Sequence, residues 1–257
     1  MPAPVNKFKQ KLISHQNQFG CWLGLADGYV SEVAATAGFD WLLIDAEHAP
    51  NDLPTIVEQL QVISNSQSHP IVRLPIGETH TIKQVLDAGA QTLLIPMVES
   101  AEQARDLVKA MRYPPAGVRG VGSALARSSK FNAITDYLTT ADDQMCLITQ
   151  IETRAGVEAL DDILAVEGVD CVFIGPSDLA ADMGMLGKND TPEFHETLND
   201  LYKRIRASGK TAGTLALNKH SVASALDSGA SFIGVGIDVL LYANAMRELA
   251  ADPTMNG

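Results

Sequence analysis

The 257-residue sequence contains few of the features that mark secreted or disulfide-bonded proteins. Its three cysteines, Cys21, Cys146 and Cys171, are odd in number and widely spaced, which argues against a disulfide framework and against a zinc knuckle. Each lies within an apolar run, where a small buried side chain in a reducing compartment is expected. We therefore expect a cytoplasmic protein.

Long apolar runs and basic clusters are also missing. Residues 1–18 contain no apolar core of a signal peptide, and no uninterrupted apolar run approaches the roughly 20 residues of a membrane helix. The chain has 19 Lys and Arg against 31 Asp and Glu, a formal net charge of −12. Because an acidic chain repels phosphate backbones, we expect neither nucleic acid nor a membrane as a partner.

Short apolar runs alternate with helical patterns along the whole chain. They are rich in leucine and β-branched residues and nearly continuous, as is typical of parallel strands covered on both faces. Eight strands are predicted: Gly20–Leu25, Trp41–Asp45, Ile71–Leu74, Thr92–Met97, Met145–Glu152, Asp170–Gly175, Thr211–Leu215 and Phe232–Gly236. Eight strands with intervening helices favour a closed (β/α)8 TIM barrel, formed by residues 1–257 as a single domain.

The connections between these runs carry signals for helix ends. Ser100–Gln103 is typical of a capping box at the start of a helix. Gly38, Gly89 and Gly229 each follow a helical pattern and precede a strand, where a left-handed C-cap is expected. The segment Tyr113–Ser123 is rich in proline and glycine and breaks the rhythm, and we expect it to reach across an active site.

In such barrels the working residues lie just past the carboxyl ends of the strands. These positions are Asp45 to His48, Arg73, Gln150 to Glu152, Gly175 to Asp178, Leu215 and Asp238. Acidic, basic and imidazole groups are therefore predicted to converge on one rim of the barrel.

Glu152 and Asp178 follow two successive strands, so the barrel should bring the two carboxylates side by side. Carboxylates at close quarters repel unless a cation or a shared proton intervenes, and all-oxygen ligation suits Mg²⁺ or Mn²⁺. The alternatives are a helix N-cap for Asp178 and a loop salt bridge for Glu152.

Three further features of the rim also allow two interpretations. The planar guanidinium of Arg73 can donate paired hydrogen bonds to the carboxylate or the keto oxygen of a keto acid, or it can form a structural ion pair. Asp45 can fix the tautomer of His48 and raise its basicity, although a lone histidine is often structural. The turn Gly175–Asp178 opens a helix whose free amides could hold an anion, or it is an ordinary tight turn.

Lysine is absent from the positions where a Schiff-base aldolase needs it. No lysine ends a predicted strand, and Lys210 precedes one and therefore faces the opposite rim. Activation of a carbonyl at this rim would consequently depend on a metal.

Four segments closely resemble signatures of the HpcH/HpaI family of class II pyruvate aldolases. They are Trp41–Pro50, Arg112–Gly120, Gln150–Thr153 and Phe173–Leu179, in the order that the family has. The likeness extends over nearly the whole chain. It implies a (β/α)8 barrel whose last helix is exchanged between paired subunits, usually in a homo-hexamer.

The resemblance also implies roles for particular residues. Glu152 and Asp178 would bind a divalent cation (Mg²⁺, Mn²⁺ or Co²⁺), Arg73 the pyruvate oxygen, and His48 with Asp45 would serve proton transfer. Substrate would contact Gln150, Leu215 and the backbone of Gly175, Pro176 and Ser177. Ser177 stands where the family commonly has alanine, and its hydroxyl could tune binding of the carboxylate.

The implied reaction is reversible cleavage of a 4-hydroxy-2-oxo acid to pyruvate and an aldehyde. The aldehyde would be succinic semialdehyde if the substrate is 4-hydroxy-2-oxoheptanedioate, or tartronate semialdehyde if it is a sugar diacid. A non-catalytic barrel that binds keto acids is the third alternative, and the intact set of Glu152, Asp178, Arg73 and His48 argues against it.

Overall fold

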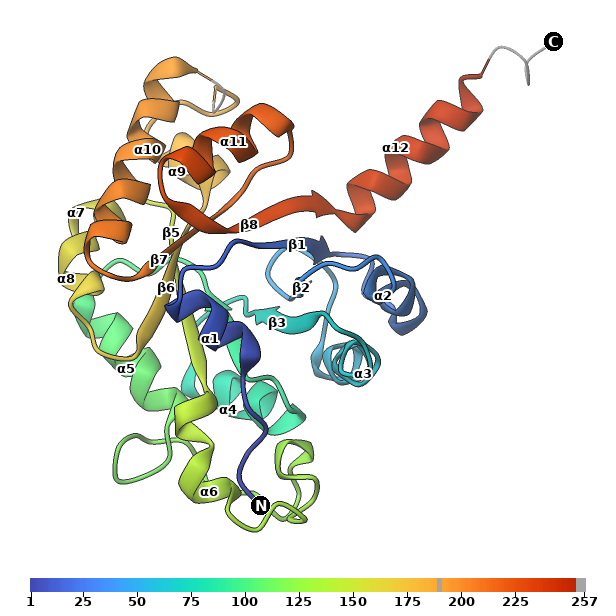
Figure 1. The fold of residues 1–257 in the computed structure, drawn as a ribbon, viewed down its shortest axis with the longest axis vertical. Helices are drawn as coiled ribbons and strands as arrows, with labels where there is room; N and C mark the ends of the chain where they lie inside the picture. The colour runs from blue at the N-terminus through green and yellow to red at the C-terminus, as the bar shows by residue number, and fades with distance from the viewer. Residues whose placement is uncertain (189–190, 253–257) are drawn as a thin grey trace.

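The computed structural model describes residues 1–188 and 191–252. Eight parallel strands follow one another around a closed barrel in sequence order, and the last pairs with the first (Figure 1). The strands are β1 (Gln18–Leu23), β2 (Trp41–Asp45), β3 (His69–Arg73), β4 (Thr92–Ile95), β5 (Cys146–Ile151), β6 (Val169–Ile174), β7 (Thr211–Leu215) and β8 (Ala230–Ile237). The expected (β/α)8 barrel is confirmed.

Helices connect the strands and cover the barrel. They are α1 (Lys7–Ile13), α2 (Gly28–Ala35), α3 (Leu53–Ile63), α4 (Thr79–Ala88), α5 (Ala101–Met111), α6 (Tyr137–Thr140), α7 (Arg154–Glu158), α8 (Leu160–Leu164), α9 (Pro176–Asp182), α10 (Pro192–Ala207), α11 (Lys219–Asp227) and α12 (Asp238–Ala250). Gly38, Gly89 and Gly229 all have positive φ, as their predicted C-cap positions require.

Two predicted local features differ in detail. Ser100 accepts a hydrogen bond from Gln103 N (3.1 Å), but the Gln103 side chain accepts from Glu99 N, so the capping box is half formed. The first strand ends at Leu23 rather than Leu25, because the amides of Gly24 and Leu25 donate to the Asp238 carboxylate (2.8 and 3.2 Å) instead of to a strand.

The interior of the barrel is filled by aromatic side chains. Trp41 and Phe232 lie with ring centroids 4.5 Å apart, and Trp22 packs against Trp41 and Phe173 at 5.5 and 5.4 Å. Helix α1 closes the end where the strands begin, since its Phe8 contacts Phe232 at 5.4 Å. The three cysteines are buried and free, as predicted.

The segment Tyr113–Ser123 does not reach across the rim, and that expectation is wrong for this chain. It follows α5, and a connection from a helix to the next strand runs at the end of the barrel where strands begin. There Arg119, which is fully buried, pairs with Asp87 at 2.8 Å and stacks on Tyr113 at 4.5 Å. Proline and glycine content indicated a loop, but only the order of elements tells which end it covers.

Helix α12 extends away from the barrel (Figure 1). It has no buried residue, and Leu240, Leu241, Met246 and Leu249 are all exposed along it. Within residues 1–188 and 191–252, no helix combines the length and the apolar character that crossing a membrane requires.

His69, the first residue of β3, makes stability depend on pH. Its ring stacks on Phe8 at 5.1 Å, and Nε2 lies 2.8 Å from Thr92 Oγ1. Burial lowers the pKa of His69 to about 3, because desolvation disfavours the charged ring. The unfolded chain binds this proton near pH 6.5, so the contribution of His69 is fully present above that pH and is lost as the pH falls toward 3.

We expect the free energy of unfolding to decrease by roughly 2 kcal/mol between pH 7 and pH 5 through His69 alone. His69→Gln keeps a hydrogen-bonding group that does not titrate, so it should remove this part of the pH dependence. Urea unfolding at both pH values measures it, with the exposed His80→Gln as the matched control. An identical pH dependence in His69→Gln and the unaltered protein would contradict the account.

Candidate active site

A cavity of about 510 Å³ opens at the carboxyl ends of the strands. Nine of the ten residues assigned to the site from the sequence line it: Asp45, His48, Arg73, Gln150, Gly175, Pro176, Ser177, Asp178 and Leu215. The tenth, Glu152, is buried beside them and 2% exposed. Asp238, the first residue of α12, instead holds the loop after β1 by accepting from the amides of Gly24 and Leu25.

Asp45 and Arg73 form an ion pair with two hydrogen bonds at the rim of this cavity. They are register partners at the ends of β2 and β3, and Arg73 Nε donates to Asp45 Oδ1 at 2.8 Å while Nη2 donates to Oδ2 at 2.5 Å. Asp45 Oδ1 also accepts from the amides of Glu47 (3.0 Å) and His48 (3.4 Å), which turns the loop after β2. The predicted pairing of Asp45 with the His48 ring is therefore not what the structure shows.

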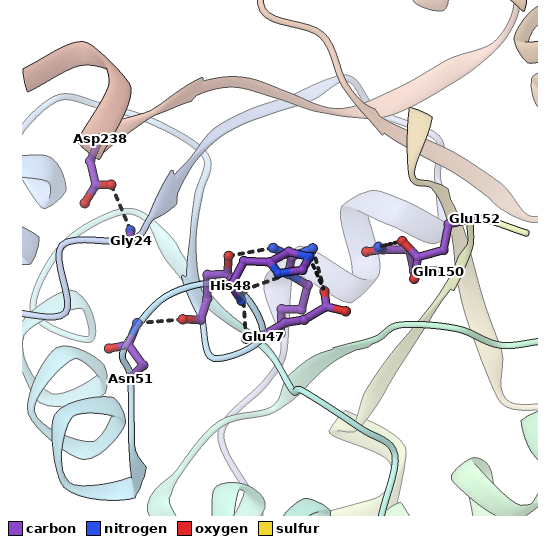
Figure 2. Close-up of polar contacts among 9 residues, drawn as sticks. Gly24, Glu47, His48, Asn51, Gln150, Glu152 and Asp238 are labelled. Carbon is purple, nitrogen blue, oxygen red and sulfur yellow. Dashed lines mark hydrogen bonds and ion pairs between the residues drawn. The ribbon is translucent and has the colours of Figure 1, made fainter. Parts of the chain in front are cut away.

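His48 lines the cavity, and Figure 2 draws its ring beside the Glu47 carboxylate. Its side chain is 64% exposed, and the nearest carboxylate oxygen is Glu47 Oε2, 3.9 Å from Nε2. A ring in this position can exchange protons with solvent while it faces a molecule in the cavity.

Glu152 is fixed through both of its carboxylate oxygens. Oε1 accepts from Met97 N at 2.9 Å, and Oε2 accepts from Gln150 Nε2 (Figure 2). Met97 has φ +55°, a left-handed conformation that is uncommon outside glycine. Burial raises the pKa of Glu152, the hydrogen bonds from Gln150 and Met97 oppose this, and the charge of Asp178 raises it further.

The alternatives for this pair of carboxylates are not observed. Asp178 is the third residue of α9, whose N-cap is Gly175, and no side chain caps that helix. Glu152 forms no salt bridge within the described part of the chain. Gly175 is required beside it, since a Cβ there would lie 2.8 Å from Glu152 Oε2.

Glu47 falls in the rim range Asp45 to His48, but the sequence reasoning gave it no role in the site. Its Oε2 lies 2.8 Å from Arg73 Nη1, and its side chain is 15% exposed. Burial raises the pKa of Glu47, the Arg73 charge lowers it, and the Glu152 charge raises it again. The available signal was its position two residues after Asp45, but nothing in the sequence showed that the loop turns back over Arg73.

The charges of the site suit a cation. Asp45 and Glu47 pair with Arg73, and the charges of Arg73 and Asp178 both act on Glu152, so the site is strongly negative when all four carboxylates are ionised. No three potential ligands gather closely enough to form a complete metal site among the described residues. A divalent cation bound by two carboxylates, with substrate and water completing its oxygen shell, fits this donor set. The buried Gln150 Oε1, which has no partner in the described chain, offers a further acceptor.

No lysine lines the cavity, in agreement with the sequence. Lys210 Nζ instead donates to Val166 O (3.2 Å) and Val169 O (2.6 Å) where β6 begins. A closed barrel with carboxylates and one arginine at its carboxyl rim is the architecture of an enzyme that acts on a small polar molecule.

The family follows from comparison with known proteins. Residues 18–245 match the HpcH/HpaI aldolase/citrate lyase family, and the chain belongs to it. Relatives include a hydroxypyruvate/pyruvate aldolase from Roseovarius nubinhibens, 61% identical over 98% of both chains, and a 4-hydroxy-2-oxo-heptane-1,7-dioate aldolase from Escherichia coli strain ATCC 8739, 52% identical over 96% of this chain and 94% of that one.

A solved structure gives the same assignment. A HpcH/HpaI aldolase/citrate lyase family protein from Burkholderia cenocepacia J2315 superposes with a TM-score of 0.93 at 35% identity, over 97% of this chain and all of that one. The resemblance identified from the four sequence motifs is thus confirmed, and the protein is an aldolase, a carbon–carbon lyase.

Proposed function

We propose that the protein is a class II aldolase that reversibly cleaves a 4-hydroxy-2-oxo acid to pyruvate and an aldehyde. The observation that carries this proposal is the cluster of carboxylates around Arg73 in a cavity without lysine. We assign Glu152 and Asp178 as ligands of Mg²⁺, Mn²⁺ or Co²⁺, which would act as a Lewis acid toward the keto acid's oxygens.

The residues around the cavity supply the rest of the chemistry. Arg73 donates to the C2 oxygen, whose negative charge grows as the pyruvate enolate forms. Gln150 and the backbone around Ser177 orient the substrate, and Leu215 bounds it on the β7 side. His48, whose side chain is exposed, takes the proton of the 4-hydroxyl during cleavage, directly or through a water.

For the substrate we propose 4-hydroxy-2-oxoheptanedioate, which gives succinic semialdehyde and is supported by the name of the Escherichia coli relative. Tartronate semialdehyde, from a sugar diacid, is the alternative aldehyde. The name of the Roseovarius relative adds hydroxypyruvate as an alternative to pyruvate in the reverse reaction.

A panel of condensation reactions tests this function. Pyruvate or hydroxypyruvate is incubated with each aldehyde, with and without Mg²⁺, Mn²⁺ and Co²⁺, and the 4-hydroxy-2-oxo acid is quantified. We expect product only when metal is present, and no lysine adduct when pyruvate is added with borohydride. A reduced pyruvate adduct on any lysine would show a Schiff-base enzyme instead.

We further propose that residues 1–257 form one domain and that six copies assemble, with α12 exchanged between paired subunits. The exposed apolar residues along α12 are not covered by any part of the chain that the structure describes, and a partner subunit would cover them. Light scattering at micromolar concentration tests the assembly, and a monomer would contradict it.

A further inference from the structure

Arg73 is held on three sides before any substrate arrives. The Asp45 carboxylate accepts hydrogen bonds from Arg73 Nε and Nη2, and Glu47 Oε2 lies 2.8 Å from Arg73 Nη1. The guanidinium carbon is 5.8 Å from the centroid of the Trp22 ring. Two of the five N–H groups of the guanidinium are hydrogen bonded to Asp45 and Nη1 is ion-paired with Glu47, which leaves N–H groups on Nη1 and Nη2 for a ligand.

Glu47 and Asp45 differ in their relation to the cavity. Asp45 lines it, whereas Glu47 is not among its lining residues. Glu47 Oε2 is buried and makes no hydrogen bond of good geometry, so its interaction with Nη1 is an ion pair. Glu47 can therefore affect a bound substrate through Arg73, its nearest partner, through His48 at 3.9 Å, or through its charge on Glu152.

We propose that Glu47 is a positioning residue for the aldol reaction, and that its ion pair with Nη1 fixes the plane of Arg73 so that the free N–H groups on Nη1 and Nη2 face the keto oxygen. The inference rests on the proposed function. A donor contributes most to catalysis when it is oriented before charge develops, and a misplacement of about 1 Å can cost on the order of 10²-fold in rate.

We expect Glu47 to contribute little to stability, because burial raises its pKa more than the Arg73 charge lowers it. Its carboxylate is largely buried and lies near the charge of Glu152, and both effects disfavour its charged form. Replacing a charge in such a cluster with a neutral group of the same shape should leave the folded state as stable, or more so. Loss of activity without loss of stability therefore separates positioning from a structural role.

The test compares Glu47→Gln and Glu47→Asp with the exposed Glu102→Gln as the control. We expect Glu47→Gln to lower kcat roughly 10- to 100-fold with little change in KM, while the melting temperature is unchanged or raised. Glu47→Asp should recover part of the activity. Binding of oxalate, a planar mimic of the enolate, should weaken more than binding of pyruvate in calorimetry with Mn²⁺.

A double-mutant cycle tests whether Glu47 acts on the reaction through Arg73. In an Arg73→Lys background, Glu47→Gln should have little further effect, because its partner is already altered. Additive effects of the two substitutions, coupling to His48→Gln instead, or an unchanged kcat in Glu47→Gln would each overturn the inference. If the unaltered enzyme cleaves no 4-hydroxy-2-oxo acid with any metal, the proposed function has failed instead.

Discussion

Glu152→Gln should abolish metal-dependent aldol cleavage, with a loss of at least about 10³-fold in rate, and leave the barrel folded. The amide cannot supply the negative charge that a hard divalent cation needs, so the cation should bind much more weakly. The amide can still accept from Met97 N through its oxygen, which preserves the 2.9 Å contact at the end of β4.

The stability of Glu152→Gln should move in the opposite direction from its activity. Burial raises the pKa of Glu152, so the metal-free folded state is more stable below the ordinary glutamate pKa and loses that stability as pH rises through the raised value. At neutral pH the substitution removes this penalty, and the metal-free melting temperature should rise once the Gln150 amide turns to present its unpartnered Oε1 to the new NH2 group. Metal affinity is measured by calorimetric titration with Mn²⁺, and kcat and the melting temperature are measured on the same preparation. The exposed Asp162→Asn serves as the control.

Removing the metal from the unaltered protein makes the same test without a mutation. An excess of chelator should eliminate turnover, and activity should return when Mn²⁺ is added back, because a catalytic metal binds to a site that is already folded. Full activity after metal removal has been verified by elemental analysis would refute both the metal and its assignment to Glu152.

Most of the fold could be predicted because strands and helix ends depend on nearby residues, namely apolar runs and C-cap glycines. Every strand bound was predicted to within two residues. Strand β1 ends two residues before its predicted end because Asp238, more than 200 residues away, accepts hydrogen bonds from the amides of Gly24 and Leu25. The placement of Tyr113–Ser123 was wrong because composition carries no information on which end of a barrel a loop covers.

The members of the site could be predicted from the rule that strand ends carry the chemistry, but their pairings could not. Asp45 was assigned to His48 because the two are close in sequence. In the structure it bonds Arg73, its register partner on the neighbouring strand. Contacts across strands depend on register and on the path of the loop after β2, and these also bring Glu47 onto Arg73.

Arg73→Ala should lower kcat by about 10²- to 10³-fold and Arg73→Lys by less, because a donor that strengthens as the enolate forms is worth roughly 3–4 kcal/mol when it is removed. Lysine keeps the charge between Asp45 and Glu47 but cannot offer the planar fork, so activity should recover only in part relative to Arg73→Ala. Steady-state kinetics of cleavage compare the two variants. The alternative is a structural arginine, for which kcat would remain near normal.

Arg73→Ala alone cannot separate these two roles, because Arg73 is only 8% exposed and neutralises two carboxylates. Its removal leaves Asp45 and Glu47 unpaired in a poorly solvated place, which costs about 3–5 kcal/mol of stability. Arg73 lies at the rim, where its loss opens no core cavity, but its two ion pairs make its removal costly. A lysine variant that keeps its melting temperature but loses kcat would show that the guanidinium acts on the substrate. A lysine variant with normal kcat and a lowered melting temperature would show that Arg73 has a structural role.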